Sequence, residues 1–154
     1  FKGKKYYFWA IIHSGTGLVV SFNLSPYRSS KAATEILYDA KKNHSEPNTI
    51  VSDSYKSYPV PIKMIFSNSN HLRVESFADE ISNNLIESFF GTFKDWYNGR
   101  KGFKTFTSAR QLICVYIFFY NFIKPHSALN GLTPAQVAGC KYSERERKSW
   151  LIAA

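Results

Sequence analysis

The sequence predicts a single α/β domain with its strands in the N-terminal half and a helical C-terminal half. Short runs of aromatic and β-branched residues, which suit a pleated sheet, are concentrated in the first half of the chain. Longer segments with apolar residues at helical spacing dominate the second half. The chain has 154 residues, the length of one ordinary domain.

The N-terminal segment predicts a β-hairpin followed by a helix. Tyr6–Ile12 is aromatic and β-branched, and Leu18–Phe22 returns after a turn that is rich in glycine and serine. Ser29 and Ser30 are both candidate N-caps for a helix that runs to Lys42, with apolar residues on one face. We therefore expect the first helix to pack against the hairpin.

Thr49–Ser52 is predicted to be a buried strand, and an acidic residue, Asp53, follows it directly. The run is too short for a helix and is bounded by the turn-forming residues Pro47 and Asn48. Open α/β sheets place their sites at the carboxyl ends of such strands. The segment 55–66 contains two prolines and has no clear period, and 72–76 predicts one more short strand.

The C-terminal half predicts three helices. Ile81–Trp96 carries a wide apolar stripe. Ser108 with Gln111 predicts a capping box for a helix that ends before Pro125. That helix is apolar nearly all round, so we expect it at the centre of the core. Thr133–Gln136 predicts the capped start of a short helix that ends at Gly139.

Composition excludes several classes of protein. The net charge of +9 favours a polyanionic partner such as nucleic acid. Two cysteines are too few for a disulfide framework or a zinc site, and Cys114, within an apolar run, is expected to be buried. The longest apolar run, Leu112–Ile123, is well short of the roughly 20 residues that a membrane helix needs. These features predict a cytoplasmic protein that binds no membrane.

Asp53 and Glu87 are the candidate catalytic residues. Glu87 lies on a polar helix stripe with Asn83, Gly91 and Lys94. Each carboxylate has a simpler interpretation, because helical glutamates are commonly solvated and aspartates commonly form turns or caps. Together, however, a strand end and a helix face offer oxygen ligands that suit Mg²⁺ or Mn²⁺. Two such ions roughly 4 Å apart perform phosphodiester chemistry.

The segments NNLIESFFGTFKDWYNGRKGFKTFTSA and YNFIKPHSALNGLTPAQVAG resemble the catalytic region of insertion-sequence DDE transposases, relatives of retroviral integrases. The earlier segments KGKKYYFWAIIHSGTGLVVSFNLSPYRSSKAA and IVSDSYKSY fit the same family in the same order. The resemblance covers about residues 1–139 and leaves a tail of residues 140–154. It implies an RNase H-like fold, which is a mixed sheet flanked by helices.

The resemblance also implies the roles of individual residues. Asp53 matches the second catalytic aspartate of the family and Glu87 its catalytic glutamate, which together with a first aspartate hold two Mg²⁺ or Mn²⁺ ions. His126 fits the pattern too, but we expect it to support a turn. The positions implied to contact DNA are Asn84, Lys94, Arg100, Lys101 and Lys104.

One part of the family pattern is missing. The first catalytic aspartate of the family lies on the central strand of the sheet, and that strand would precede Phe1. We therefore expect a core domain for DNA cleavage and strand transfer that is inactive as this fragment. The resemblance further implies transposon-end and target DNA as partners, a homodimer or higher oligomer near the nucleoid, and no small-molecule substrate. Two alternatives stay open: a non-catalytic nucleic-acid-binding or assembly module, and an unrelated basic α/β binding domain.

Overall fold

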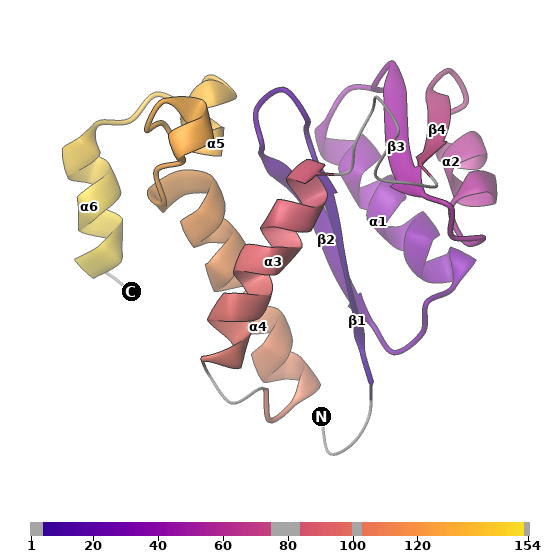
Figure 1. Cartoon of the computed structure of the whole chain (residues 1–154), viewed down its shortest axis with the longest axis horizontal. Helices are drawn as coiled ribbons and strands as arrows, with labels where there is room; N and C mark the ends of the chain where they lie inside the picture. Colours follow the sequence, from indigo (N-terminus) through magenta and orange to yellow (C-terminus); the bar gives the residue numbers. More distant parts are fainter. Residues whose placement is uncertain (1–4, 75–83, 100–102, 153–154) are drawn as a thin grey trace. The chain divides into compact units, whose positions relative to one another are not determined.

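The computed structural model describes residues 5–74, 84–99 and 103–152 (Figure 1). They form an α/β fold, as the sequence predicts. The strands are β1 (Tyr7–Ile12), β2 (Val19–Ser25), β3 (Thr49–Asp53) and β4 (Asn70–Val74). The helices are α1 (Ser30–Asn43), α2 (Pro59–Ile65), α3 (Asn84–Asn98), α4 (Phe106–Phe118), α5 (Pro134–Val137) and α6 (Glu144–Ile152), with a π-helix over Phe119–Ile123 and a 3-10 turn over Ser127–Leu129.

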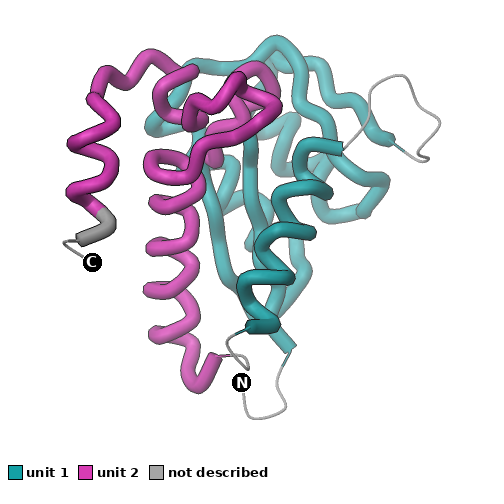
Figure 2. Tube along the Cα trace, turned by 60° about the vertical axis from the view of Figure 1, so that its left-hand side comes forward, with its two compact units in different colours: residues 1–12, 20–102 teal, residues 13–19, 103–154 magenta. Residues whose placement is uncertain are grey.

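The chain divides into two compact units, and neither is a continuous stretch of sequence (Figure 2). The first unit consists of residues 1–12 and 20–102. The second consists of residues 13–19 and 103–154. β1 and all of β2 except its first residue, Val19, therefore belong to the first unit, while the turn that joins the strands belongs to the second.

The described strands of the first unit form two separate pairs. β1 and β2 form a hairpin, and β3 pairs with β4 in parallel, with Thr49 opposite Asn70 and Asp53 opposite Val74. Within the described residues no hydrogen-bonded ladder joins the two pairs. Side-chain packing and the connections between elements must therefore hold the two pairs together.

A core cluster built mainly on α1 receives side chains from both strand pairs. Ser29 caps its N-terminus by accepting a hydrogen bond from the Ala32 N–H, as one of the two predicted caps. Its buried face, which includes Ile36, joins a core cluster with Trp9 of β1, and Ile50 of β3 packs against that cluster. The core around α1 thus includes a side chain from each strand pair.

One prediction for this unit is wrong, and one segment without a predicted element contains a helix. β3 is not a buried strand, because Ile50 and Val51 are only half-buried and the described chain gives the strand a ladder partner on one edge. The segment 55–66 has no clear period, yet it contains α2. Its prolines, Pro59 and Pro61, stand in the first turn of α2, where the backbone N–H groups have no partner within the helix.

Helix α3 packs on β1 through aromatic rings, within the first unit. The ring of Phe8 lies 4.6 Å from that of Phe93 and 6.0 Å from that of Phe89, measured between centroids, and both partners are buried. Glu87 and Lys94 are exposed on this helix, as the predicted polar stripe requires. The start predicted for this helix, at residue 81, lies outside the described residues.

Helix α4 corrects two further predictions. Its capping box is formed by Thr105 and Ser108, not by Ser108 and Gln111: each of the first two side chains accepts the other's backbone N–H at 3.1 Å. The helix is also not buried all round, because Val115 is 56% exposed and Phe118 44%. Ala109, Ile113, Tyr116 and Ile117 form its single buried face.

Cys114 is exposed, so its predicted burial is wrong. It lies on the uncovered side of α4, one position after the buried Ile113. Among the described helices none is by itself long and apolar enough to cross a membrane. The stretches 106–123 and 127–137, bent by 40° at their junction, pass that test as a pair by length and composition alone.

The second unit is organised around buried polar side chains. Asn121, in the π-helix, accepts a hydrogen bond from the Val19 N–H (3.0 Å) and donates one to the Val19 carbonyl (2.9 Å). Thr133 caps α5 in a reciprocal box with Gln136, as predicted, and bonds the Tyr142 hydroxyl. These contacts tie the hairpin turn and the C-terminal segments together.

Candidate active site

Asp53 is the last residue of β3 and lies at the carboxyl end of a parallel strand pair. Its Oδ1 accepts the Tyr55 N–H at 3.1 Å, which closes a tight turn after the strand. Its side chain is 52% exposed. The residue therefore forms the turn that its simpler interpretation predicts, and it also presents a carboxylate to solvent.

The second carboxylate oxygen of Asp53 is paired with Arg28. The Arg28 Nη2 donates to Asp53 Oδ2 at 2.8 Å. The guanidinium also lies over the ring of Tyr55, 3.7 Å from its centroid. Arg28 comes from the connection between β2 and α1, so this contact joins the two strand pairs next to the candidate carboxylate.

Further hydrogen bonds fix the backbone of Arg28 in place. The hydroxyls of Tyr55 and Ser57 donate to the Arg28 carbonyl, at 3.2 and 3.3 Å. Ser57 is buried and Tyr55 is half-buried, so these bonds are partly shielded from water. Side chains from the segment after β3 therefore hold Arg28 at its carbonyl as well as at its guanidinium.

Electrostatics keep Arg28 charged and Tyr58 neutral. Burial lowers the pKa of Arg28, but its interactions with Tyr58 and Asp53 outweigh this, so the pKa lies above its ordinary value. Burial raises the pKa of the Tyr58 hydroxyl, and the Asp53 charge adds to the rise. Arg28 is thus a permanent cation beside the Asp53 carboxylate.

Two more polar contacts surround the end of β3. Arg73 of β4 donates to the Ser54 carbonyl at 3.1 Å. The Ser52 hydroxyl and His71 Nε2 lie 2.9 Å apart across the parallel pair. Burial, aided by the Arg73 charge, lowers the pKa of His71. The neighbourhood of Asp53 is therefore basic, because Arg28 pairs with its carboxylate and Arg73 bonds the carbonyl of the next residue, Ser54.

Glu87 lies in the first turn of α3 and is exposed. The shared metal site that the resemblance implies for Glu87 and Asp53 stays a prediction. Asn84 is the first residue of α3 and is exposed, as are Lys94 in the same helix and Lys104 just before α4. Arg100 and Lys101 lie outside the described residues.

The carboxylate oxygens of Asp53 are ligands of the type that a hard divalent cation prefers. Carboxylate oxygens are the ligands that Mg²⁺ and Mn²⁺ prefer, and Asp53 offers one carboxylate that is half open to water. The described residues nowhere bring together three His, Cys, Asp or Glu side chains suited to a metal. Asp53 would therefore hold such an ion with help from water or from groups beyond the described set.

Sequence reasoning missed Arg28 and Tyr55. Arg28 stands 25 positions before Asp53 in a serine-rich connection, where nothing in the local pattern marks an arginine as a site residue. The one available signal was the tyrosine two positions after a candidate catalytic aspartate, because an exposed aromatic ring can hold a guanidinium.

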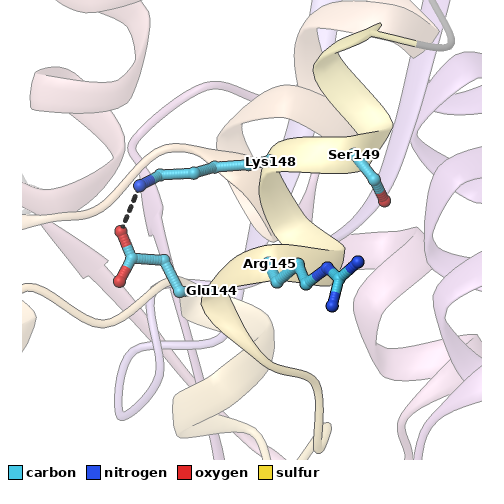
Figure 3. A pocket seen from close by; sticks show the side chains of 4 residues that line it. All are labelled: Glu144, Arg145, Lys148 and Ser149. Atoms are coloured by element: carbon cyan, nitrogen blue, oxygen red, sulfur yellow. Dashed lines mark ion pairs between the residues drawn. The ribbon is translucent and has the colours of Figure 1, made fainter.

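A hollow on the surface of α6 offers no comparable chemistry. It is lined by Glu144, Arg145, Lys148 and Ser149, and Lys148 pairs with Glu144 at 2.8 Å (Figure 3). Both partners of the pair are about two-thirds exposed. This is a solvated helix surface with an i,i+4 ion pair, so Asp53 remains the candidate site of the described chain.

Comparison with known proteins adds a family. Residues 1–126 match the family model of a DDE domain, that of the IS240 transposase type. The chain is also similar to an uncharacterized 31.7 kDa protein of insertion element IS407 from Burkholderia multivorans, with 36% identity over 73 residues. That match covers 47% of this chain and 26% of the relative, so it spans about a quarter of the relative's length.

Proposed function

Because this chain belongs to the family of insertion-sequence DDE transposase domains, we propose that it forms the catalytic core of a DNA transposase. The reaction is metal-dependent cleavage and transfer of DNA strands, with Asp53 and Glu87 as two of the catalytic carboxylates. The observation that carries the proposal is the position of Asp53: half-exposed, at the carboxyl end of a parallel strand, inside the family match.

The proposal includes an RNase H-like sheet with one further strand between β1 and β3. Two features of the first unit support it. The pairs β1–β2 and β3–β4 have no ladder between them in the described residues, yet Trp9 of the first and Ile50 of the second join one core cluster with α1. A strand carrying the family's first aspartate would join the pairs and bring a second carboxylate beside Asp53.

Divalent ions would supply the chemistry at this site by activating the attacking oxygen and stabilising the leaving one. Asp53 would hold an ion through its carboxylate, and Glu87 would supply a further oxygen ligand. Without the first aspartate each ion has too few protein ligands, so residues 1–154 alone should bind metal weakly and leave DNA uncut.

The test compares residues 1–154 with a version extended by the coding sequence upstream of Phe1. We expect Mg²⁺-dependent strand cleavage from the extended protein only, and its loss in Asp53→Asn and in Glu87→Gln. Asp95→Asn, which removes an exposed acid from the same helix as Glu87, is the matched control and should stay active. Full activity in Glu87→Gln would overturn the assignment. DNA binding without cleavage by every version would favour the non-catalytic module.

The DNA contacts are proposed to be electrostatic. Asn84, Lys94 and Lys104 are exposed, and the net charge is +9. Phosphate contacts make DNA affinity fall as salt rises. A plot of log affinity against log salt concentration falls with a slope of about 0.9 per contact. Lys94→Gln should therefore lower the slope by about one unit. Lys148→Gln should leave the slope nearly unchanged, since Lys148 is already paired with Glu144. An equal change in both variants would contradict a contact at Lys94.

The remaining expectations follow from the function. The partners would be transposon-end and target DNA, and copies of the same chain in a homodimer or larger assembly. The place of action would be the cytoplasm beside the nucleoid, and the core would be the segment 1–139, with residues 140–154 as an appended tail.

A further inference from the structure

Arg28 makes two kinds of contact with the segment after β3. Its backbone carbonyl accepts hydrogen bonds from the Tyr55 and Ser57 hydroxyls. Its guanidinium pairs with the Asp53 carboxylate and stacks on Tyr55. The first kind does not depend on which side chain residue 28 carries. The carbonyl bonds can therefore hold the connection in place while the side chain does something else.

The guanidinium places a full positive charge on Asp53 Oδ2. At 2.8 Å this is a charge-assisted hydrogen bond, and it occupies the oxygen that Tyr55 leaves free. A cation that binds Oδ2, or both oxygens, must therefore compete with Arg28. The pair is also open to solvent, with the two side chains 35% and 52% exposed. An exposed pair of this kind contributes little free energy, so another cation can exchange with it.

We propose that Arg28 is the resident counter-ion of Asp53, and that a divalent cation binds this carboxylate by displacing the guanidinium. The inference rests on the proposed function, since it takes Asp53 as a metal ligand. Arg28 is in this sense a positioning residue: it holds the Asp53 carboxylate in place, and a metal ion must bind that carboxylate tightly enough to displace the guanidinium. The ring of Tyr55 keeps the displaced guanidinium close by, because stacking does not require the carboxylate.

The test measures Mn²⁺ binding to residues 1–154 at about 0.15 M salt, where unrelated surface charges are screened. Free Mn²⁺ is followed by electron paramagnetic resonance. Arg28→Gln removes the competing charge and keeps the carbonyl contacts, so affinity should rise by roughly threefold to fivefold. Arg28→Lys keeps the charge and should stay near the wild type. A purely structural role would make Arg28→Gln bind less tightly.

Arg73→Gln is the matched control. It removes an equal charge that lies next to Asp53 in the fold but bonds the Ser54 carbonyl instead of the carboxylate. We expect it to change Mn²⁺ affinity by less than about twofold. A gain equal to that of Arg28→Gln would mean that net charge alone acts, and would overturn the proposal. So would unchanged or weaker binding in Arg28→Gln.

A measurement on the unaltered chain guards against a variant that fails to fold. Titration with Mg²⁺ should shift the NMR signal of the Arg28 side-chain N–H with the same midpoint as the Asp53 amide. A moving Asp53 signal with a fixed Arg28 signal would overturn the competition. Asp53→Asn distinguishes a failure of the proposed metal site from a failure of the competition by Arg28. If this variant binds Mn²⁺ like the wild type, the metal site at Asp53 is wrong, whatever Arg28 does.

Discussion

The two units of the molecule each fix a long-range connection with a polar side chain, but in opposite surroundings. In the second unit Asn121 holds both backbone groups of Val19, and Asn121 is 5% exposed. In the first unit Arg28 holds Asp53, and both side chains are open to water. The Asn121 contact is neutral and buried, whereas the Arg28 contact is charged and exposed to solvent.

This difference decides what each contact can do. A buried hydrogen bond is costly to break, because the abandoned partner finds no water. An exposed ion pair costs little to break, because water and ions replace the lost partner. The Asn121 contact is therefore suited to permanent structure and the Arg28 contact to exchange. Four predictions test this contrast, from the largest expected effect to the smallest.

Asn121→Ala should lower the free energy of unfolding by about 2–4 kcal/mol, since it strands the N–H and the carbonyl of Val19 in a buried place. Urea melts would measure it as a lower midpoint at unchanged slope. Asn23→Ala is the matched control, because the Asn23 amide donates to Glu35 at an exposed site. Equal losses in the two variants would remove the contrast between buried and exposed contacts.

The two capping boxes provide a second comparison. Thr133 is fully buried and Thr105 is exposed, yet each caps a helix through its hydroxyl. Thr133→Val should cost about 1–2 kcal/mol of unfolding free energy, and Thr105→Val about half of that. Tyr142 keeps a second partner in Thr133→Val, because its hydroxyl also donates to the Phe122 carbonyl. Thermal melts of both variants would rank them, and a larger loss for Thr105 would contradict the prediction.

Acid should weaken the second unit through His126. Its Nε2 donates to the Tyr120 carbonyl at 3.1 Å, and burial lowers its pKa below the ordinary 6.5, helped by the Lys124 charge. The unfolded chain therefore takes up the proton first, and stability falls as the pH drops from about 6.5 through the lower folded value. An NMR titration of the imidazole would measure the folded pKa directly. A value at or above 6.5 would refute the prediction.

Arg28→Gln should change the free energy of unfolding least, by about 1 kcal/mol or less, because the pair it breaks is exposed. The carbonyl bonds from Tyr55 and Ser57 remain. Urea melts of this variant, set beside those of Asn121→Ala, complete the comparison. A loss as large as that of Asn121→Ala would make Arg28 a structural residue instead of an exchangeable partner.

Local patterns predicted the elements whose causes are local. The hairpin, the Ser29 cap of α1 and the Thr133 box were readable because their residues are within a few positions of one another. Helix α2 was not predicted because its segment shows no clear period, and its two prolines stand in the first turn, where a helix tolerates them. The Thr105 box was missed because its second member is a serine instead of the usual glutamate or glutamine.

The site was only partly predictable. Asp53 could be found from its position after a strand, but its partner could not, since the fold alone brings Arg28 across 25 positions. The exposure of Val115 and Phe118 was hidden for a similar reason. An apolar composition says that a helix can be buried, but only the packing of its neighbours decides which face is covered.

The discontinuity of the two units limits how the protein can be dissected. A fragment that begins at Phe103 would contain Asn121 but lack Val19, so its amide would lose both of its backbone partners. Removal of residues 103–154 would in turn leave the hairpin turn without the unit to which it belongs. Limited proteolysis at the 102–103 boundary should therefore yield pieces that stay associated after the cut. A single chain in which residues 103–154 are linked directly to residues 13–19 is the simplest route to the second unit alone.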